Sequence, residues 1–319
     1  MMDIALQKNI SFQCAITSET KKKVNEDCRK LICSATLNVN ELKHLFDAYI
    51  CGSDQIWSPF FMPIKKEYYL PFVPKGKKIA YAPSFGVSSL PEYHKRTIRK
   101  YVDDFQYLSV REKHAISIVE DLCGKTPLYV CDPTMLLSPD EWNHFFDTYS
   151  CNLKSVPDKY VLVYCLSNLD DMMVRVVNEA CSGENVILQP KRENCPYQNG
   201  LSYDIGVFDF LELIKKAKYV ITDSFHGTVF SILFRKQFVV IPRNNTEKAK
   251  QGSRIESLLD VMGIKQRFWH GKVSLETLLH ESIDYEQVFF CLDKYRCKSQ
   301  IFLRNALEEI EQNAKEKGQ

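Results

Sequence analysis

The sequence predicts an α/β protein built from two Rossmann-like, parallel-sheet domains that face a cleft. Short apolar strands alternate with longer amphipathic segments along the chain, and this alternation is typical of strand–helix–strand units with a parallel sheet. The 319 residues exceed the roughly 250 to 300 that one hydrophobic core usually holds. Clusters of small polar residues follow several strands, and ligands of such proteins bind at the carboxyl ends of strands.

The first half of the chain predicts one of these domains. Its short apolar runs predict strands at 48–51, 78–82, 107–110 and 128–131. Spaced apolar residues among charged ones predict helices at 90–104 and 112–122. A capping pattern at Ser138 begins another helix, and the polar stretch 151–158 follows it. We therefore expect domains at 1–155 and 156–293.

The second half repeats the alternation of strand and helix. Strands are expected at 160–165, 185–189, 218–221 and 238–241. Helices are expected at 169–181, 207–217, 227–235, 253–262 and 275–279. A long charged helix is predicted over 294–317, and we expect it to pack back on the first domain.

Composition narrows the class of protein. The chain is 45% hydrophobic and 26% charged, with a net charge of +2, so it lacks the basicity that nucleic-acid binding favours. Apolar runs all fall short of the roughly 18 residues of a membrane span, and the start does not resemble a signal peptide. We therefore expect a cytoplasmic protein. Its twelve cysteines form no CxxC pair, so we expect reduced, mostly buried thiols and no metal site.

The segment 220–228 carries the strongest site signal, because a cluster of small polar residues separates a strand from a helix there. Asp223, Ser224 and His226 fall in this turn. The unpaired amides and positive dipole at a helix start stabilise a phosphate or carboxylate, and His226 would lie beside that anion. The alternative is that Asp223 and Ser224 only cap the helix while His226 is satisfied in the packing.

Two arginines are further candidates for anion binding. Arg111 follows the strand 107–110, and its planar fork of donors matches carboxylate or phosphate geometry. A salt bridge to Glu112 or Asp104 is the competing interpretation. Arg254 follows Ser253, a candidate N-cap, and could add a second positive charge to an anion that faces His226; a surface ion pair with Glu256 or Glu247 is the competing interpretation.

The loops after the first two strands predict contacts with hydroxyl groups. Ser53 and Asp54 can bind hydroxyls or cap a helix, Gln55 lies beside them, and Trp57 could present a flat face to a sugar ring. Core packing is the alternative for this segment. Ser84 occupies a similar loop of small residues, which permits close approach by a ligand. Asp132, which precedes a proline, predicts a structural turn at the cleft rim.

Several common motifs are absent from the sequence. Neither GxGxxG nor GxxxxGK[ST] occurs, so dinucleotide and P-loop sites lack their usual glycines. The GxSxG and HExxH patterns of serine hydrolases and zinc proteases are also missing.

The ordered motifs of the chain resemble the polysaccharide pyruvyl transferase family. They run from about Tyr49 to about Met262 and read GSDQIW, YAPSFG, SVRE, DPT, TDSFHG and SRIESLL. The resemblance implies a two-Rossmann-domain architecture of the GT-B type, with the acceptor side at 1–155 and the donor side at 156–293. Members usually open with a strand and an Asn-Tyr-Gly type loop, which nothing before Tyr49 supplies, so the N-terminal domain is expected to be shortened.

The resemblance also implies an activity. Family members transfer a pyruvyl group from phosphoenolpyruvate to saccharide hydroxyls as a cyclic ketal, in the synthesis of cell-surface or exopolysaccharides, and no cofactor is expected. The family's basic and histidine positions fall on Arg111 and His226 as catalytic residues, with Arg254 as a further counterpart. The donor site therefore comprises Arg111, Ser224, His226, Gly227 and Arg254.

The acceptor site is expected at Ser53, Asp54, Gln55, Trp57 and Ser84. Whether the acceptor is lipid-linked, and whether the protein associates peripherally with the inner face of the membrane, stays open. A nucleotide-sugar-dependent glycosyltransferase on the same architecture and a catalytically silent binding or scaffold protein are the alternative functions.

Overall fold

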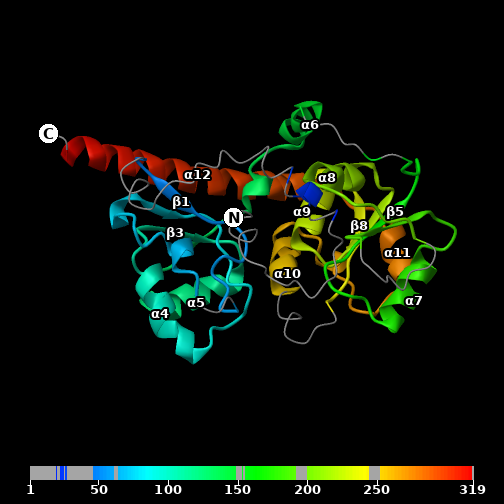
Figure 1. Cartoon of the computed structure of the whole chain (residues 1–319), viewed down its shortest axis with the longest axis horizontal. Helices are drawn as coiled ribbons and strands as arrows, with labels where there is room; N and C mark the ends of the chain where they lie inside the picture. Colours follow the sequence, from blue (N-terminus) through cyan, green and yellow to red (C-terminus); the bar gives the residue numbers. More distant parts are fainter. Residues whose placement is uncertain are drawn as a thin grey trace. The chain divides into compact units, whose positions relative to one another are not determined.

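The computed structural model describes residues 19, 22–24, 26, 46–60, 64–148, 153, 155–191, 200–243 and 252–317. These residues divide into two compact units (Figure 1). The β1–β4 unit comprises the described parts of 36–137, 250–263 and 286–319, and the β5–β8 unit comprises those of 138–249 and 264–285, with the few described residues before 35.

A four-stranded parallel sheet forms the centre of the β1–β4 unit. Its strands are β1 (Tyr49–Cys51), β2 (Lys78–Ala80), β3 (Tyr107–Val110) and β4 (Leu128–Tyr129). They pair in chain order, β1-β2-β3-β4, with every neighbour parallel. All four lie where the sequence predicts them. Because they are parallel, the loops that follow them meet at one carboxyl edge.

Helices cover both faces of this sheet. The helices α4 (Glu92–Val102) and α5 (Lys113–Cys123) connect successive strands, and right-handed crossovers between strands in sequential order place both on the same face. Alternate strand residues confirm this, since Ala80, Leu108 and Val110 share a core cluster with α4 and α5. The neighbouring positions along the strands point to the opposite face.

The long helix α12 (Tyr285–Lys317) covers that opposite face. Ile79 and Tyr107 pack there against Ala306 and Ile310, and Figure 1 shows α12 running along the sheet. The packing of the terminal helix on the first sheet is therefore as predicted. The helix begins earlier than the predicted residue 294, because its first turns are apolar and buried at residues such as Val288 and Leu292.

The helix α10 (Gly252–Val261) and short 3-10 turns at Lys66–Tyr69, Lys75–Lys77 and Pro133–Met135 complete this unit.

A second four-stranded parallel sheet forms the centre of the β5–β8 unit. Its strands are β5 (Val161–Tyr164), β6 (Val186–Gln189), β7 (Tyr219–Thr222) and β8 (Gln237–Val240). Their order is β6-β5-β7-β8. The chain moves from β5 to one side and then returns to the other side of β5, so a topological switch point lies between β5 and β7. Open parallel sheets bind ligands at such points.

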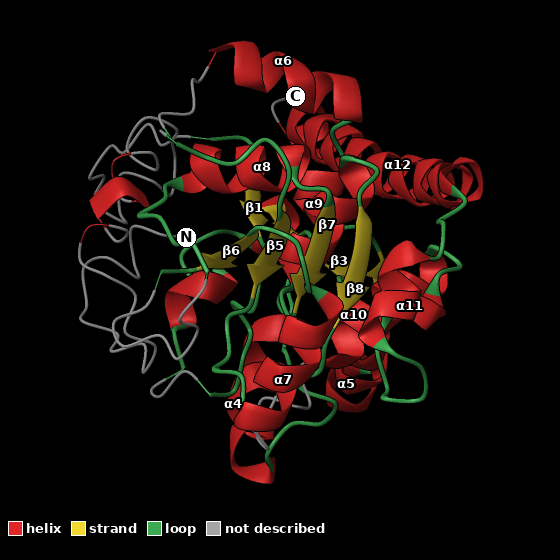
Figure 2. Cartoon of the chain, turned by 90° about the vertical axis from the view of Figure 1, so that its right-hand side faces the viewer, coloured by secondary structure: helices red, strands yellow, loops and turns green. Residues whose placement is uncertain are grey.

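The helices of this unit follow from that strand order. The reversal at β5 places α7 (Asp171–Ala180) on one face, and α8 (Val207–Lys216) and α9 (Phe225–Leu233) on the other. Figure 2 shows α7 and α8 on opposite sides of the strands. The helix α11 (Leu275–His280) joins α7 in one core cluster with Val161 and Val163. The remaining elements are α6 (Pro139–Thr148) and a 3-10 turn at Lys265–Arg267.

The α/β class and the two parallel sheets are thus confirmed. The division between the compact units falls after Leu137 in this part of the chain, whereas the sequence places a domain boundary near 155. The GT-B-like arrangement and the cleft stay predictions. Among the helices that the structure describes, none is long and apolar enough to cross a membrane.

Candidate functional site

Arg111 holds together three loops at the carboxyl edge of the β1–β4 sheet. Its Nη1 donates to Asp132 Oδ2 at 2.6 Å, and its Nη2 donates to Asp54 Oδ1 at 3.1 Å. Ser53 Oγ donates to the same Asp132 oxygen at 2.8 Å. The loops that follow β1, β3 and β4 are therefore connected through one buried guanidinium. The predicted alternative partners of Arg111 were Glu112 and Asp104, but Arg111 forms ion pairs with Asp132 and Asp54.

The charges around Arg111 stabilise its cationic form. Burial alone lowers the pKa of this guanidinium, but the carboxylates of Asp132, Asp54 and Glu112 outweigh that cost and leave the pKa raised. One positive charge thus lies among three carboxylates. An anion that approaches Arg111 meets these carboxylates as competitors.

The backbone of the Gly52–Asp54 loop is fixed by the loop after β2. Ser84 N–H donates to Asp54 O at 2.8 Å, and Trp57 N–H donates to Ser84 O at 3.2 Å. Gly52 has φ of +135°, and a Cβ on it would lie 1.7 Å from the carbonyl oxygen of Tyr81. Glycine is therefore required at this close approach.

Glu112 also holds the loop that follows β2, through its side chain. Its Oε1 accepts hydrogen bonds from the backbone N–H groups of Phe85 at 2.9 Å and Gly86 at 3.2 Å. From the sequence, Glu112 is predicted only as a possible partner of Arg111. Its position two residues after the end of the strand 107–110, beside Arg111, was the available signal.

The predicted acceptor residues differ in their exposure. Asp54 is exposed, Gln55 is half-buried, and Ser53 and Ser84 are buried. Trp57 is fully buried and stacks on Tyr69 with ring centroids 5.3 Å apart. Trp57 therefore follows the core-packing alternative, because an indole inside the aromatic core presents no open face to a sugar.

The start of α9 has the geometry of a capped helix N-terminus. Ser224 is the N-cap, and its Oγ accepts from Gly227 N–H at 3.2 Å. Thr222 Oγ1 accepts from Ser224 N–H at 3.0 Å and donates to Tyr164 O at 2.6 Å. A Cβ on Gly227 would lie 2.4 Å from Thr222 Oγ1, so only glycine lets the helix start so close to β7.

Asp223 connects the loops on the two sides of the topological switch point. Its carboxylate accepts from the N–H groups of Leu166 at 2.6 Å and Ser167 at 2.9 Å, and from the hydroxyl of Ser167. Arg243, which follows β8, donates from Nε to Asp223 O at 3.1 Å and lies 3.6 Å from the carboxylate. Arg243 follows a predicted strand but is not among the predicted site residues.

His226 lies in the first turn of α9, beside the capped terminus. Its ring is half-buried and meets Phe225 edge-to-face with centroids 5.5 Å apart. Ser224, His226 and Gly227 are thus brought together at the carboxyl end of β7. The positive end of the α9 dipole at this point favours an anion.

Arg254 belongs to the other unit. It is buried in the first turn of α10, which starts at Gly252, so Ser253 lies inside the helix rather than before it. The structure groups Arg254 with Arg111 in the β1–β4 unit, while His226 belongs to the β5–β8 unit. Its predicted contribution to an anion that faces His226 stays a prediction.

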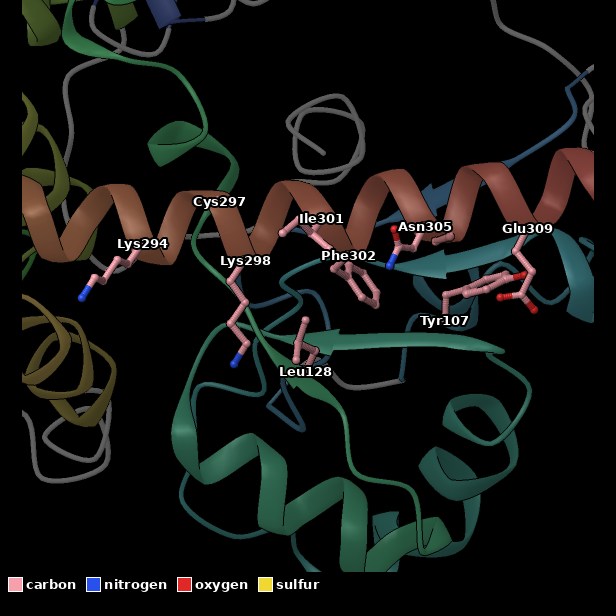
Figure 3. Close-up of a pocket in the computed structure, with 10 residues that line it drawn as sticks. Tyr107, Leu128, Lys294, Cys297, Lys298, Ile301, Phe302, Asn305 and Glu309 are labelled. Carbon is pink, nitrogen blue, oxygen red and sulfur yellow. The ribbon is translucent and has the colours of Figure 1, made fainter.

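A groove of about 610 Å³ lies elsewhere in the β1–β4 unit, between α12 and the amino-terminal ends of β3 and β4 (Figure 3). Its walls include Tyr107, Leu128, Phe302 and the lysines 294 and 298. None of the predicted site residues lines it. The groove is therefore separate from the carboxyl edge where Arg111 lies.

Comparison with known proteins gave one family. A family model described as "Polysaccharide pyruvyl transferase" matches residues 7–245. No curated protein matches the chain. The match begins well before Tyr49, where the motifs had suggested that the resemblance starts, and it ends before Arg254 and the SRIESLL segment. The predicted shortening before Tyr49 concerns residues that lie almost wholly outside the described part of the chain.

Proposed function

The chain belongs to the polysaccharide pyruvyl transferase family, and from this premise we propose that it transfers the pyruvyl group of phosphoenolpyruvate to two hydroxyls of a saccharide. Family membership establishes a transferase of this type acting on a saccharide acceptor. The identity of the donor and a role in exopolysaccharide synthesis are our proposal. The observation that carries it is the family match over 7–245, which includes both Arg111 and the TDSFHG segment.

The proposed reaction balances without an oxidant or a cofactor. A proton adds to the methylene carbon of phosphoenolpyruvate, which makes its central carbon electrophilic. One saccharide hydroxyl adds to that carbon and loses its proton. A second hydroxyl of the same saccharide then replaces phosphate and closes the ketal, so the products are the ketal and inorganic phosphate.

His226 is proposed to act on this donor in the β5–β8 unit. Histidine donates and accepts protons readily near neutral pH, which suits protonation of the methylene carbon or of the leaving phosphate. The N–H groups and dipole of the first turn of α9 favour the phosphate itself. Ser224 and Gly227 complete this terminus, since the Ser224 hydroxyl holds the Gly227 amide.

Arg111 and the loop beside it are proposed to act in the β1–β4 unit. A guanidinium matches a carboxylate through two parallel hydrogen bonds, which is the geometry of the donor's carboxyl group. The exposed Asp54 and half-buried Gln55 are the acceptor-binding candidates with side chains open to solvent. The buried Ser84 holds the backbone of Asp54 through its N–H, and the buried Ser53 donates to Asp132.

Titration calorimetry tests the donor. We expect the purified protein to bind phosphoenolpyruvate and to give no heat with uridine diphosphate sugars. Binding of the nucleotide sugars alone would instead indicate a glycosyltransferase, and binding of neither would favour a silent scaffold.

Substitution of His226 tests the mechanism, with release of phosphate from phosphoenolpyruvate measured over a panel of saccharides. We expect His226→Ala to lower turnover by about 10²- to 10⁴-fold if the side chain transfers protons, or to raise the Kd for the donor if it holds phosphate. His144→Ala is the matched control, because His144 is exposed on α6 of the same unit. Unchanged turnover and unchanged donor affinity in His226→Ala would contradict the assigned role.

A further inference from the structure

The two aspartates that pair with Arg111 differ sharply in exposure. Asp132 is 2% exposed and accepts from Nη1 at 2.6 Å, with Ser53 and Thr134 also donating to its carboxylate. Asp54 is 52% exposed and accepts from Nη2 at 3.1 Å. Asp132 is thus a fixed part of the fold. The Asp54 carboxylate lies on the side of the guanidinium that is nearer to solvent.

The backbone beneath Asp54 is held more firmly than its side chain. Asp54 has φ of +62°, in the left-handed region that side chains other than glycine, asparagine and aspartate rarely adopt. Such a conformation persists where the surroundings impose it, and here the Ser84 N–H binds Asp54 O at 2.8 Å. Rotation of the side chain can therefore release the carboxylate from Arg111 while the loop stays in place.

We propose that Asp54 determines affinity for the donor, because its carboxylate occupies the edge of Arg111 that the donor carboxylate takes. This inference rests on the proposed function. The exchange replaces one carboxylate by another on the same guanidinium, so the charge of Arg111 stays compensated. Asp54 is 52% exposed and Arg111 keeps its buried partner Asp132, so release of the Asp54 carboxylate destabilises the protein little, whereas displacement of Asp132 would destabilise it strongly.

The exchange also explains how one residue can serve two substrates. A neutral ligand cannot replace Asp54, since it offers no charge to Arg111, and so this edge of the guanidinium selects anions. Once displaced, the Asp54 carboxylate faces solvent and can accept a hydrogen bond from a saccharide hydroxyl. That is the acceptor-binding role that the sequence predicts for it.

The decisive variant is Asp54→Asn. Asparagine tolerates the left-handed backbone and keeps a hydrogen-bond acceptor, but it removes the competing charge. Asp103→Asn is the matched control, because Asp103 is 55% exposed and pairs with Lys125 at 2.9 Å in the same unit. Both variants lose one negative charge. They differ in that only Asp54→Asn removes the carboxylate that competes with the donor for Arg111.

Calorimetry on the full-length proteins measures the Kd for three probes. We expect Asp54→Asn to bind phosphoenolpyruvate and pyruvate about two- to fivefold more tightly than Asp103→Asn does. This fold-change corresponds to the small free energy of an ion pair whose carboxylate is exposed. Inorganic phosphate should show no such difference, since its proposed site is the start of α9 and not Arg111. Melting temperatures of the two variants confirm that both are folded.

Three results would overturn the inference while the wild type still binds phosphoenolpyruvate. Equal affinities of the two variants for phosphoenolpyruvate mean that Asp54 does not compete. Weaker binding by Asp54→Asn means that Asp54 contacts the donor directly, and an equal gain for inorganic phosphate means that a general charge effect operates. If the wild type itself does not bind phosphoenolpyruvate, the proposed function fails and the inference falls with it. Donor binding by the wild type without a gain in Asp54→Asn rejects the inference alone.

Discussion

Arg111 Nη1 and Asp132 Oδ2 lie 2.6 Å apart, with both side chains almost completely buried. This pair joins the ends of β3 and β4, and Ser53 extends it to the end of β1. A buried charge is stable only while its partner is present, because the protein interior solvates an isolated ion poorly. The pair therefore couples the folding of the β1–β4 unit to the geometry of its carboxyl edge.

Loss of Asp132 should destabilise the protein strongly. We expect Asp132→Ala to lower the free energy of unfolding by about 3–5 kcal/mol, since it leaves the Arg111 guanidinium buried without its closest carboxylate. Asp54→Asn should cost about 1 kcal/mol or less, because Asp54 is 52% exposed and Arg111 keeps its buried partner Asp132. Urea denaturation followed by circular dichroism measures both values. Similar small losses in the two variants would show that the Arg111–Asp132 pair does not stabilise the fold.

The terminal helix should be required for the stability of the β1–β4 unit. Ile310 is 4% exposed and packs on Ile79 and Tyr107, whereas Ile301 on the same helix is 47% exposed. We expect Ile310→Ala to cost about 2–5 kcal/mol through lost burial and the cavity it leaves, and Ile301→Ala to stay within about 0.5 kcal/mol. The midpoints of chemical denaturation compare the two. Equal midpoints would mean that α12 does not cover this face in solution.

The secondary structure was largely predictable because apolar periodicity reports it directly. The strand 107–110 has the predicted bounds, and the other strands differ from their predicted bounds by one or two residues. The start of α12 was missed by nine residues, because residues 285–293 read as apolar rather than as part of a charged helix. Packing on the sheet, rather than local pattern, decides where that helix begins.

The partners within the candidate sites were much less predictable. Polar residues after strands could be recognised, but the pairing of Arg111 with Asp132 depends on β4 lying beside β3, and that of Asp223 with Arg243 on β8 lying beside β7. Each of these partners lies about twenty residues away in the chain. Burial of Trp57 was equally hidden, since a single aromatic residue in a loop carries no periodicity.

The stability of the β5–β8 unit should depend on the charge of Asp223. We call the contacts of Asp223 with Leu166, Ser167 and Arg243 the Asp223 clamp. We expect Asp223→Asn to lower the free energy of unfolding by about 1.5–3 kcal/mol, because an amide replaces a carboxylate that accepts several hydrogen bonds and lies near Arg243. Asp158→Asn, at an exposed position of the same unit, is the control and should change little. Thermal and urea unfolding provide the measurement. A loss no greater than that of the control would show that the clamp depends on geometry and not on charge.

Cysteine reactivity should separate the exposed thiol on α12 from those in the two cores. Burial raises the pKa of Cys51 and of Cys181 to about 12, and only the thiolate reacts with iodoacetamide. Cys297 is exposed, so we expect alkylation of native protein at pH 8 to modify Cys297 while Cys51 and Cys181 stay intact. Raising the pH to 9 should leave both buried thiols unmodified, because that value is still far below 12.

The same shifts set the sign of a pH effect on stability. The ordinary thiol pKa of 9.0 applies to the unfolded chain, and the folded values for Cys51 and Cys181 are higher, so unfolding releases protons from these groups above pH 9. Their contribution to stability is therefore complete below about pH 9 and is lost as the pH rises toward 12.

Mass spectrometry of peptides from native and urea-unfolded protein measures the alkylation. Modification of Cys51 or Cys181 in native protein as fast as that of Cys297 would contradict the burial that the structure assigns to them.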